Sequence, residues 1–465
     1  MIKISASLFA LTLCAQCLAT AADTPPPLKI HASELPNGLK IVLAEDRSRP
    51  VVNLQVWYHV GSKDEKVNRT GFAHLFEHLM FRGSKNVGPE QHMRYIREAG
   101  GVLNAYTSFD QTVYWETFPS NFLERIIWLE ADRLASLDVS DVNFKKEREV
   151  VKEERRLRYE NPPYGTLLEE VLKNTFTVYP YKHSPIGSME DLNKAAITDV
   201  QAFHALYYVP NNATIVAVGD FDTKEALALI TKHFAPIPKG KPIPRVTTKE
   251  PELTAGREVT VKDKKAPLDA VVTAYHLPPL GHPDTYALEI ASSILSSGQS
   301  SRLYKRLVYD EQSALAAQGQ SLFLEGPSIF FGFAVVNQGK NIKEVATSLE
   351  FTFNEMAAKP VTDEELSKAK NQTIAGFILG REGVQPRADF LGRCAVLLNN
   401  PELYNTELDK YRKVTAADVQ RVVTKYLAKN KQIKLFIQPD LAGAKPDAPA
   451  AKPDAPAAKK KDTKK

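Results

Sequence analysis

Two kinds of hydrophobic pattern alternate along this chain. Continuous β-rich runs, VVNLQVWYHVG from Val51 and DAVVTAYHLPP from Asp269, predict buried strands that lead into helices. Two later segments, DVQAFHALYYVPNNATIVAV from Asp199 and DVQRVVTKYLAKNKQIKLFI from Asp418, each predict an amphipathic helix, a short turn and a strand. The second pair is offset by 219 residues, nearly half the chain. We expect an α+β fold of two halves, each a duplicated α/β unit with a mixed or antiparallel sheet flanked by helices; chance similarity is the alternative.

Composition breaks set the expected boundaries of these halves. Prolines and lysines in APIPKGKPIPR, from Ala235 to Arg245, interrupt both the helical and the strand periodicity. They predict a linker over residues 236–250. We expect an N-terminal domain over residues 28–235 and a C-terminal domain over residues 251–440. Residues 441–465 contain a repeated Lys-Pro-Asp-Ala-Pro unit and end in lysines, which predicts a disordered tail.

The N-terminus has the pattern of a targeting segment. Lys3 precedes an apolar run, and Ala19-Thr20-Ala21 fits a signal-peptidase site, so we expect a cleaved signal peptide over residues 1–21. The run is short for a transmembrane anchor, which is the alternative, and no later segment is apolar enough to span a membrane. These features predict a periplasmic or otherwise exported protein. Cleavage would leave Cys394 as the one cysteine, without an internal disulfide.

Length and charge narrow the functional classes. The 465 residues are 43% hydrophobic and 25% charged, enough for more than one domain. The formal net charge is +5, but residues 444–465 carry seven lysines and three aspartates, so the folded body is about neutral. A nucleic-acid partner, which would need a basic face on that body, is not expected.

The candidate chemistry lies in TGFAHLFEHLMF, an apolar stretch that predicts a helix. His74 and His78 are four residues apart, so both imidazoles project from one helix face, and Glu77 lies in the same sector. Two neutral imidazoles supply two corners of a tetrahedral zinc site, but a catalytic zinc needs a third protein ligand and a position for water. Glu77 would then act as the general base on that water.

This H-x-x-E-H motif resembles that of the inverzincin (M16) zinc peptidases, which include pitrilysin, insulin-degrading enzyme and the mitochondrial processing peptidases. The resemblance extends from Leu35 to Pro439 and is strongest to short, two-half bacterial members. It implies two bowl-like halves that enclose a chamber, one Zn2+ per chain, and a third ligand about 76 residues after the second histidine.

In KKEREVVKEERR that register implies Glu154 as the metal ligand, and Glu147, seven residues earlier, as a carboxylate that orients a histidine. Glu149 and Glu153 are competing candidates on the same charged helix. The resemblance also implies that GGVLNAYTSFDQTVYWETF holds an edge strand that pairs with an extended peptide, with Asn104 and Ala105 beside the scissile bond.

The second half lacks a metal motif and departs from the family pattern. Val308 and Leu315 stand where the family often has an arginine and a tyrosine that bind substrate, and Arg302 and Tyr309 have that separation in another register. The resemblance therefore implies a zinc endopeptidase for small or unfolded peptides that needs a related M16-type subunit without the zinc motif, or a second copy in a homodimer. The alternatives are a non-catalytic scaffold or assembly subunit and a metal-dependent hydrolase of another substrate.

Overall fold

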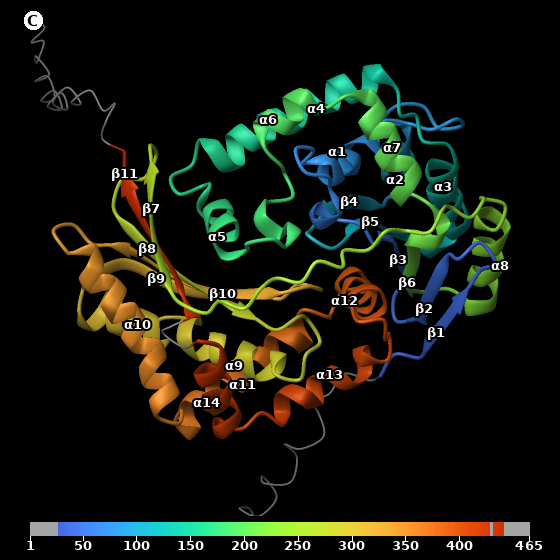
Figure 1. The fold of residues 1–465 in the computed structure, drawn as a ribbon. Coiled ribbons are helices and arrows are strands. Elements are labelled where there is room, and N and C mark those ends of the chain that lie inside the picture. Colours follow the sequence, from blue (N-terminus) through green and yellow to red (C-terminus); the bar gives the residue numbers. More distant parts are fainter. Residues whose placement is uncertain (1–26, 428–430, 441–465) are drawn as a thin grey trace, which may run out of the picture.

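The computed structural model describes residues 27–427 and 431–440, which form two mixed β-sheets flanked by helices (Figure 1). The expected α+β architecture is confirmed. The expected signal peptide and tail lie outside the described residues. Among the described residues, no helix combines the length and apolarity that crossing a membrane requires.

The first sheet has six strands in the order β1-β2-β6-β3-β5-β4. Its strands are β1 (Ile30–Glu34), β2 (Lys40–Glu45), β3 (Val51–Tyr58), β4 (Val102–Thr107), β5 (Thr112–Pro119) and β6 (Ala213–Gly219). Strands β2 and β6 run parallel, and every other neighbouring pair is antiparallel. Strand β4 therefore lies at one edge of this sheet.

The second sheet repeats five of these strands. Its order is β7-β11-β8-β10-β9, with β7 (Arg257–Asp263), β8 (Ala270–Leu277), β9 (Ala314–Leu322), β10 (Ser328–Val336) and β11 (Ile433–Pro439). Strands β7 and β11 are parallel, and the others pair antiparallel. The order and directions match β2-β6-β3-β5-β4 strand by strand, so both halves have the same topology, as duplication of one unit predicts.

Helices cover both sheets. In the first half they are α1 (Phe72–Leu79), α2 (Gln91–Glu98), α3 (Leu123–Ser136), α4 (Asp141–Arg155), α5 (Leu167–Thr175), α6 (Met189–Lys194), α7 (Ile197–Tyr207) and α8 (Thr223–Phe234). In the second half they are α9 (Thr285–Ser296), α10 (Ile342–Ala358), α11 (Asp363–Leu379), α12 (Val384–Val396), α13 (Leu403–Arg412) and α14 (Ala416–Tyr426). Two π-helical segments, Arg156–Glu160 and Tyr304–Asp310, follow α4 and α9. The two expected helix-turn-strand units are α7 with β6 and α14 with β11.

Each half sends one helix across to the sheet of the other half (Figure 1). Helix α12 packs under the first sheet, where Ala388 and Leu391 belong to the same buried apolar cluster as Trp57. Gly392 is required there, because a Cβ would come within 2.2 Å of the Trp57 indole. Reciprocally, Leu172 of α5 packs in a cluster with the buried face of the second sheet. Burial of these apolar surfaces on both sides holds the halves together.

The chain between the halves is not a loose tether. Residues 235–256 form no helix or strand, yet Arg245 donates to the His59 carbonyl at 2.7 Å and to Asn212 Oδ1 at 2.8 Å. The Glu250 carboxylate accepts three backbone N–H groups from residues 177–179 at 2.5–3.0 Å. The segment is therefore fixed along the surface of the first half.

Candidate active site

Helix α1 separates an apolar face from a polar one. Its Phe72, Leu75, Phe76 and Leu79 are buried in the core of the first half, while its two histidines and its glutamate lie on the other side. Gly71 directly precedes the helix as its N-cap, and its φ of 91° lies in the left-handed region that favours glycine. The Glu65 carboxylate accepts the N–H groups of Gly71 and Ala73 at 2.9 and 2.8 Å, which satisfies two donors at the helix start.

Helix α4 brings a carboxylate to the two imidazoles. Glu154 Oε2 lies 3.6 Å from His74 Nε2 and 3.3 Å from His78 Nε2. Potential ligand atoms of the three side chains all lie within 4.8 Å of one another. Two imidazole nitrogens and one carboxylate oxygen form the donor set of a catalytic zinc site, so these residues fit the metal that the motif implies.

The other glutamates of α4 divide by helix face. Glu147 is buried, and its Oε2 lies 3.4 Å from His78 Nδ1 while its Oε1 pairs with Arg82 Nε at 2.6 Å. Glu149 and Glu153 are each 56% exposed at the side chain and pair with Lys152 and Arg156, respectively. The structure therefore brings Glu147 and Glu154 to the histidines and turns the two competing candidates toward solvent.

The protonation of the two histidines differs. Burial and the neighbouring His78 lower the pKa of His74 to about 4. Burial also disfavours the charged form of His78, but the Glu147 and Glu154 carboxylates outweigh it and raise the His78 pKa to about 9. The hydrogen bond with His78 in turn lowers the pKa of Glu154. One imidazolium thus lies between two carboxylates, and a divalent cation bound there would displace its proton.

Glu77 lies in the same cavity but does not share these contacts. Its Oε2 accepts a hydrogen bond from Thr107 Oγ1 at 2.7 Å and lies 4.0 Å from His74 Nε2. Burial raises the Glu77 pKa, and the Thr107 hydroxyl opposes that rise. The cavity has a volume of about 420 Å³, and its lining includes the motif residues together with Asn104 and Ala105. Glu77 is placed to exchange a proton with a molecule in this cavity.

Strand β4 presents Asn104 and Ala105 at the edge of the first sheet. Asn104 pairs with Trp115 of β5 on one side, and β4 has no second strand neighbour among the described residues. The next residue, Tyr106, donates its hydroxyl to Asp389 Oδ1 of α12 at 2.6 Å. A helix of the second half therefore holds the strand that borders the cavity.

Three side chains of the site escaped the sequence analysis. Thr107 holds Glu77, Arg82 pairs with Glu147, and Arg158 Nη1 lies 2.8 Å from Glu154 Oε1. Only Arg158 had a local signal, since it follows Glu154 by four residues, one helical turn.

The second half also has a cavity, of about 380 Å³, between α9, β9 and α11. Its lining includes Ser293, Ser297 and Thr373 together with the carboxylate of Glu289, and no histidine among the described residues lines it. This cavity therefore lacks the two imidazoles of the first-half site.

In the second half, the segment that departs from the family pattern has no unpaired arginine among its described residues. Arg302 makes a two-pronged ion pair with Glu365 at 2.7 and 2.8 Å. Val308 packs against the second core, and Leu315 is 54% exposed. Tyr309 is 74% exposed.

Comparisons with known proteins agree with this architecture. A family model described as "Insulinase (Peptidase family M16)" matches residues 40–188, and one described as "Peptidase M16 inactive domain" matches residues 194–373. "Zinc protease PqqE" of Helicobacter pylori is 30% identical over 418 residues, 88% of this chain and 93% of that protein. The chain belongs to peptidase family M16.

Other M16 proteins extend the likeness. A probable mitochondrial-processing peptidase subunit beta of Arabidopsis thaliana is 24% identical over 85% of this chain and 76% of its own. The crystal structure of a protease from Helicobacter pylori superposes with a TM-score of 0.84 at 30% identity, covering 89% of this chain and all of that one. These M16 relatives support a peptidase-type function.

Proposed function

We propose that the chain is a zinc-dependent endopeptidase that cleaves small or unfolded peptides. The observation that carries the proposal is the convergence of His74, His78 and Glu154, beside Glu77, in a cavity bordered by an edge strand. The names of the M16 relatives, zinc protease and processing peptidase, support the metal and the substrate class.

His74, His78 and Glu154 would hold one zinc ion per chain. The chemistry that a zinc ion would supply there is that of a Lewis acid, which would make water a stronger acid and polarise the scissile carbonyl. Glu77 accepts a proton at its carboxylate and later returns it to the departing amine, which its buried position and raised pKa favour. Glu147 holds His78 at Nδ1, so that Nε2 faces Glu154.

Asn104 and Ala105 would bind the substrate through the main chain of β4. An extended peptide that adds to a sheet edge is held by backbone hydrogen bonds, which do not depend on its side chains. This mode suits a peptidase with many substrates.

A partner subunit would complete the site. The sequence lacks the expected arginine and tyrosine at Val308 and Leu315, and Arg302 is engaged by Glu365. Loss of charge stabilisation in a peptidase typically costs about 3 kcal/mol of barrier, so the isolated chain is expected to turn over slowly. We further propose export, with partner and substrate outside the cytoplasm, on the pattern of residues 1–21.

The test uses the purified chain and a Glu77→Gln variant. Elemental analysis should find one zinc per chain in both, and only the unmodified chain should cleave an unstructured peptide, faster when a co-purified partner is added. A second function, a scaffold subunit, is favoured by the match of residues 194–373 to an inactive domain. Bound zinc without cleavage dependent on Glu77, even with the partner, would support the scaffold. Full turnover by a verified monomer would exclude the partner requirement.

A further inference from the structure

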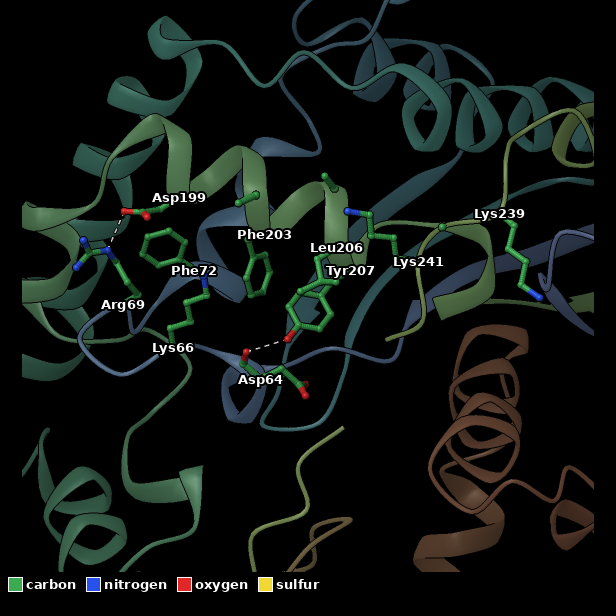
Figure 2. Close-up of a pocket in the computed structure, with 13 residues that line it drawn as sticks. Asp64, Lys66, Arg69, Phe72, Asp199, Phe203, Leu206, Tyr207, Lys239 and Lys241 are labelled. Atoms are coloured by element: carbon green, nitrogen blue, oxygen red, sulfur yellow. Dashed lines mark hydrogen bonds and ion pairs between the residues drawn. The ribbon is translucent and has the colours of Figure 1, made fainter. Parts of the chain in front are cut away.

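A second cavity, which we call the groove, lies on the outer surface of helix α7, apart from the cavity that contains the histidines (Figure 2). It has a volume of about 570 Å³, within the range of small-molecule sites. The loop before α1, helix α7 and the start of the segment between the halves enclose it. Neither the metal site nor the edge strand contributes to it.

The floor of this groove is aromatic and continuous with the metal helix. The Phe203 ring lies 6.3 Å from that of Phe72 and 4.8 Å from that of Tyr207. It also stacks on Phe76 at 5.5 Å. Phe72 and Phe76 belong to α1, on the face away from His74, so the groove lies directly behind the helix that carries the histidines. An apolar chain in the groove would contact this floor.

Unpaired cations border the apolar floor. Lys66, Lys239 and Lys241 are exposed, and none has a carboxylate partner recorded within the described part of the chain. Arg69, in contrast, is neutralised by Asp199 at 2.8 Å. Figure 2 shows the side chains of Lys66 and Lys241 extending toward the aromatic floor, and that of Lys239 pointing away. The lining holds four cations, Lys66, Arg69, Lys239 and Lys241, against two carboxylates, Asp64 and Asp199. The excess of positive charge favours an anion.

The segment that carries Lys241 is held in place by hydrogen bonds between its backbone and the side chain of Asn211. Asn211 Oδ1 accepts from Gly240 N at 2.7 Å, and Asn211 Nδ2 donates to the Lys241 carbonyl at 3.0 Å. A Cβ at Gly240 would come within 2.6 Å of Val209, so this close approach requires glycine. The segment is thereby fixed to the turn after α7, which places Lys241 beside the groove.

We propose that this groove binds an anionic amphiphile, a small molecule with an apolar chain and one carboxylate head. The chain would lie on the Phe203 floor, and the head would pair with Lys66 or Lys241. The proposal does not rest on the proposed peptidase activity.

Calorimetric titration with decanoate, below its micelle concentration, tests the proposal on the full chain. Decanoate should bind saturably at one site, and decanol and decyltrimethylammonium should bind on the order of tenfold more weakly or not at all. A Lys66→Gln/Lys241→Gln double variant should lose about tenfold for decanoate and keep its affinity for decanol. Lys224→Gln/Lys305→Gln, which changes two exposed lysines elsewhere, is the matched control. Ala205→Trp, at an exposed position of α7, should fill the groove and abolish binding.

Several results would overturn the proposal. Absence of saturable decanoate binding would reject the site, and equal affinities for decanoate and decanol would make it apolar only. Unchanged decanoate affinity in the lysine double variant, or in Ala205→Trp, would place the ligand elsewhere. Saturable binding of an acidic amphipathic peptide but not of decanoate would make the groove a protein-docking site instead.

Discussion

The hydrogen bond from Thr107 to Glu77 should set the pH at which the peptidase becomes active. Thr107→Val keeps the shape of the side chain and removes the donor, which lies 2.7 Å from Glu77 Oε2. A hydrogen bond to a charged group contributes about 1.5–3 kcal/mol, and 1.36 kcal/mol corresponds to one pKa unit. Because the bond stabilises the carboxylate, its loss should raise the Glu77 pKa by about 1–2.

The sign of the kinetic effect follows from the role of Glu77 as a base. The carboxylate must be ionised to accept a proton, so the acidic limb of the kcat/KM profile should move to higher pH by about 1–2 units, with the plateau retained. Peptide cleavage measured from pH 4 to 9 would show it. Thr107→Ser, which keeps the hydroxyl, should restore the profile. Thr112→Val removes a hydroxyl from the paired strand position, where it donates to the Val60 carbonyl instead, and should leave the limb unmoved. A lower plateau with an unmoved limb in Thr107→Val would refute the argument.

Three further predictions concern the metal, the halves and acid stability. Glu154→Gln should lose zinc by elemental analysis, whereas Glu153→Gln, on the exposed face of the same helix, should retain it; equal metal contents would refute the assigned register. Asp389→Ala should raise KM for peptides several-fold and barely change zinc content, because it releases Tyr106 of the edge strand. The Lys63 and His59 partners of Glu325 overcome its burial and lower its pKa to about 2. The stabilising contribution of Glu325 is therefore present above pH 4.5 and lost as pH falls toward 2. In urea unfolding, Glu325→Gln should be less stable than the unmodified chain at pH 7 and equally stable near pH 2. A stability difference that stays constant with pH would contradict this.

Much of the fold could be predicted from local patterns of hydrophobic and polar residues. The apolar positions of α1 and the continuous runs of β3 and β8 encode their own structure, because each buries one face or both. The shared strand order of the halves follows from the repeat at 219 residues. The segment GGVLNAYTSFDQTVYWETF, expected to hold an edge strand, forms two strands, β4 and β5. They are separated by residues 108–111, where Ser108 N donates to the Gln111 carbonyl and closes a turn. A strand pattern does not reveal this turn, because Phe109 continues its apolar alternation.

The residues of the site could be predicted from the sequence alone only where they share one helix. His74 and His78 are linked by spacing alone, and the choice of Glu154 over Glu153 needed the family register. The contact of Thr107 with Glu77 depends on how a hairpin packs against a helix thirty residues earlier in the chain, for which the sequence carries no period. The exchange of helices α5 and α12 was likewise hidden, since an apolar helix face does not specify which sheet covers it.

The exchange of helices α5 and α12 between the halves gives the second half a structural role, although it lacks the metal ligands. The Tyr106 hydroxyl bonds to Asp389 of α12, so the edge strand that would bind peptide is positioned by the second half. The same helix buries one face of the first sheet through Leu391 and Gly392, and α5 buries one face of the second sheet. One face of each sheet is covered by a helix of the other half, so cutting the chain within residues 236–250 should leave two fragments that stay associated rather than two independent domains. The second half therefore contributes to the proposed catalysis through the placement of β4, although no histidine among the described residues lines its own cavity.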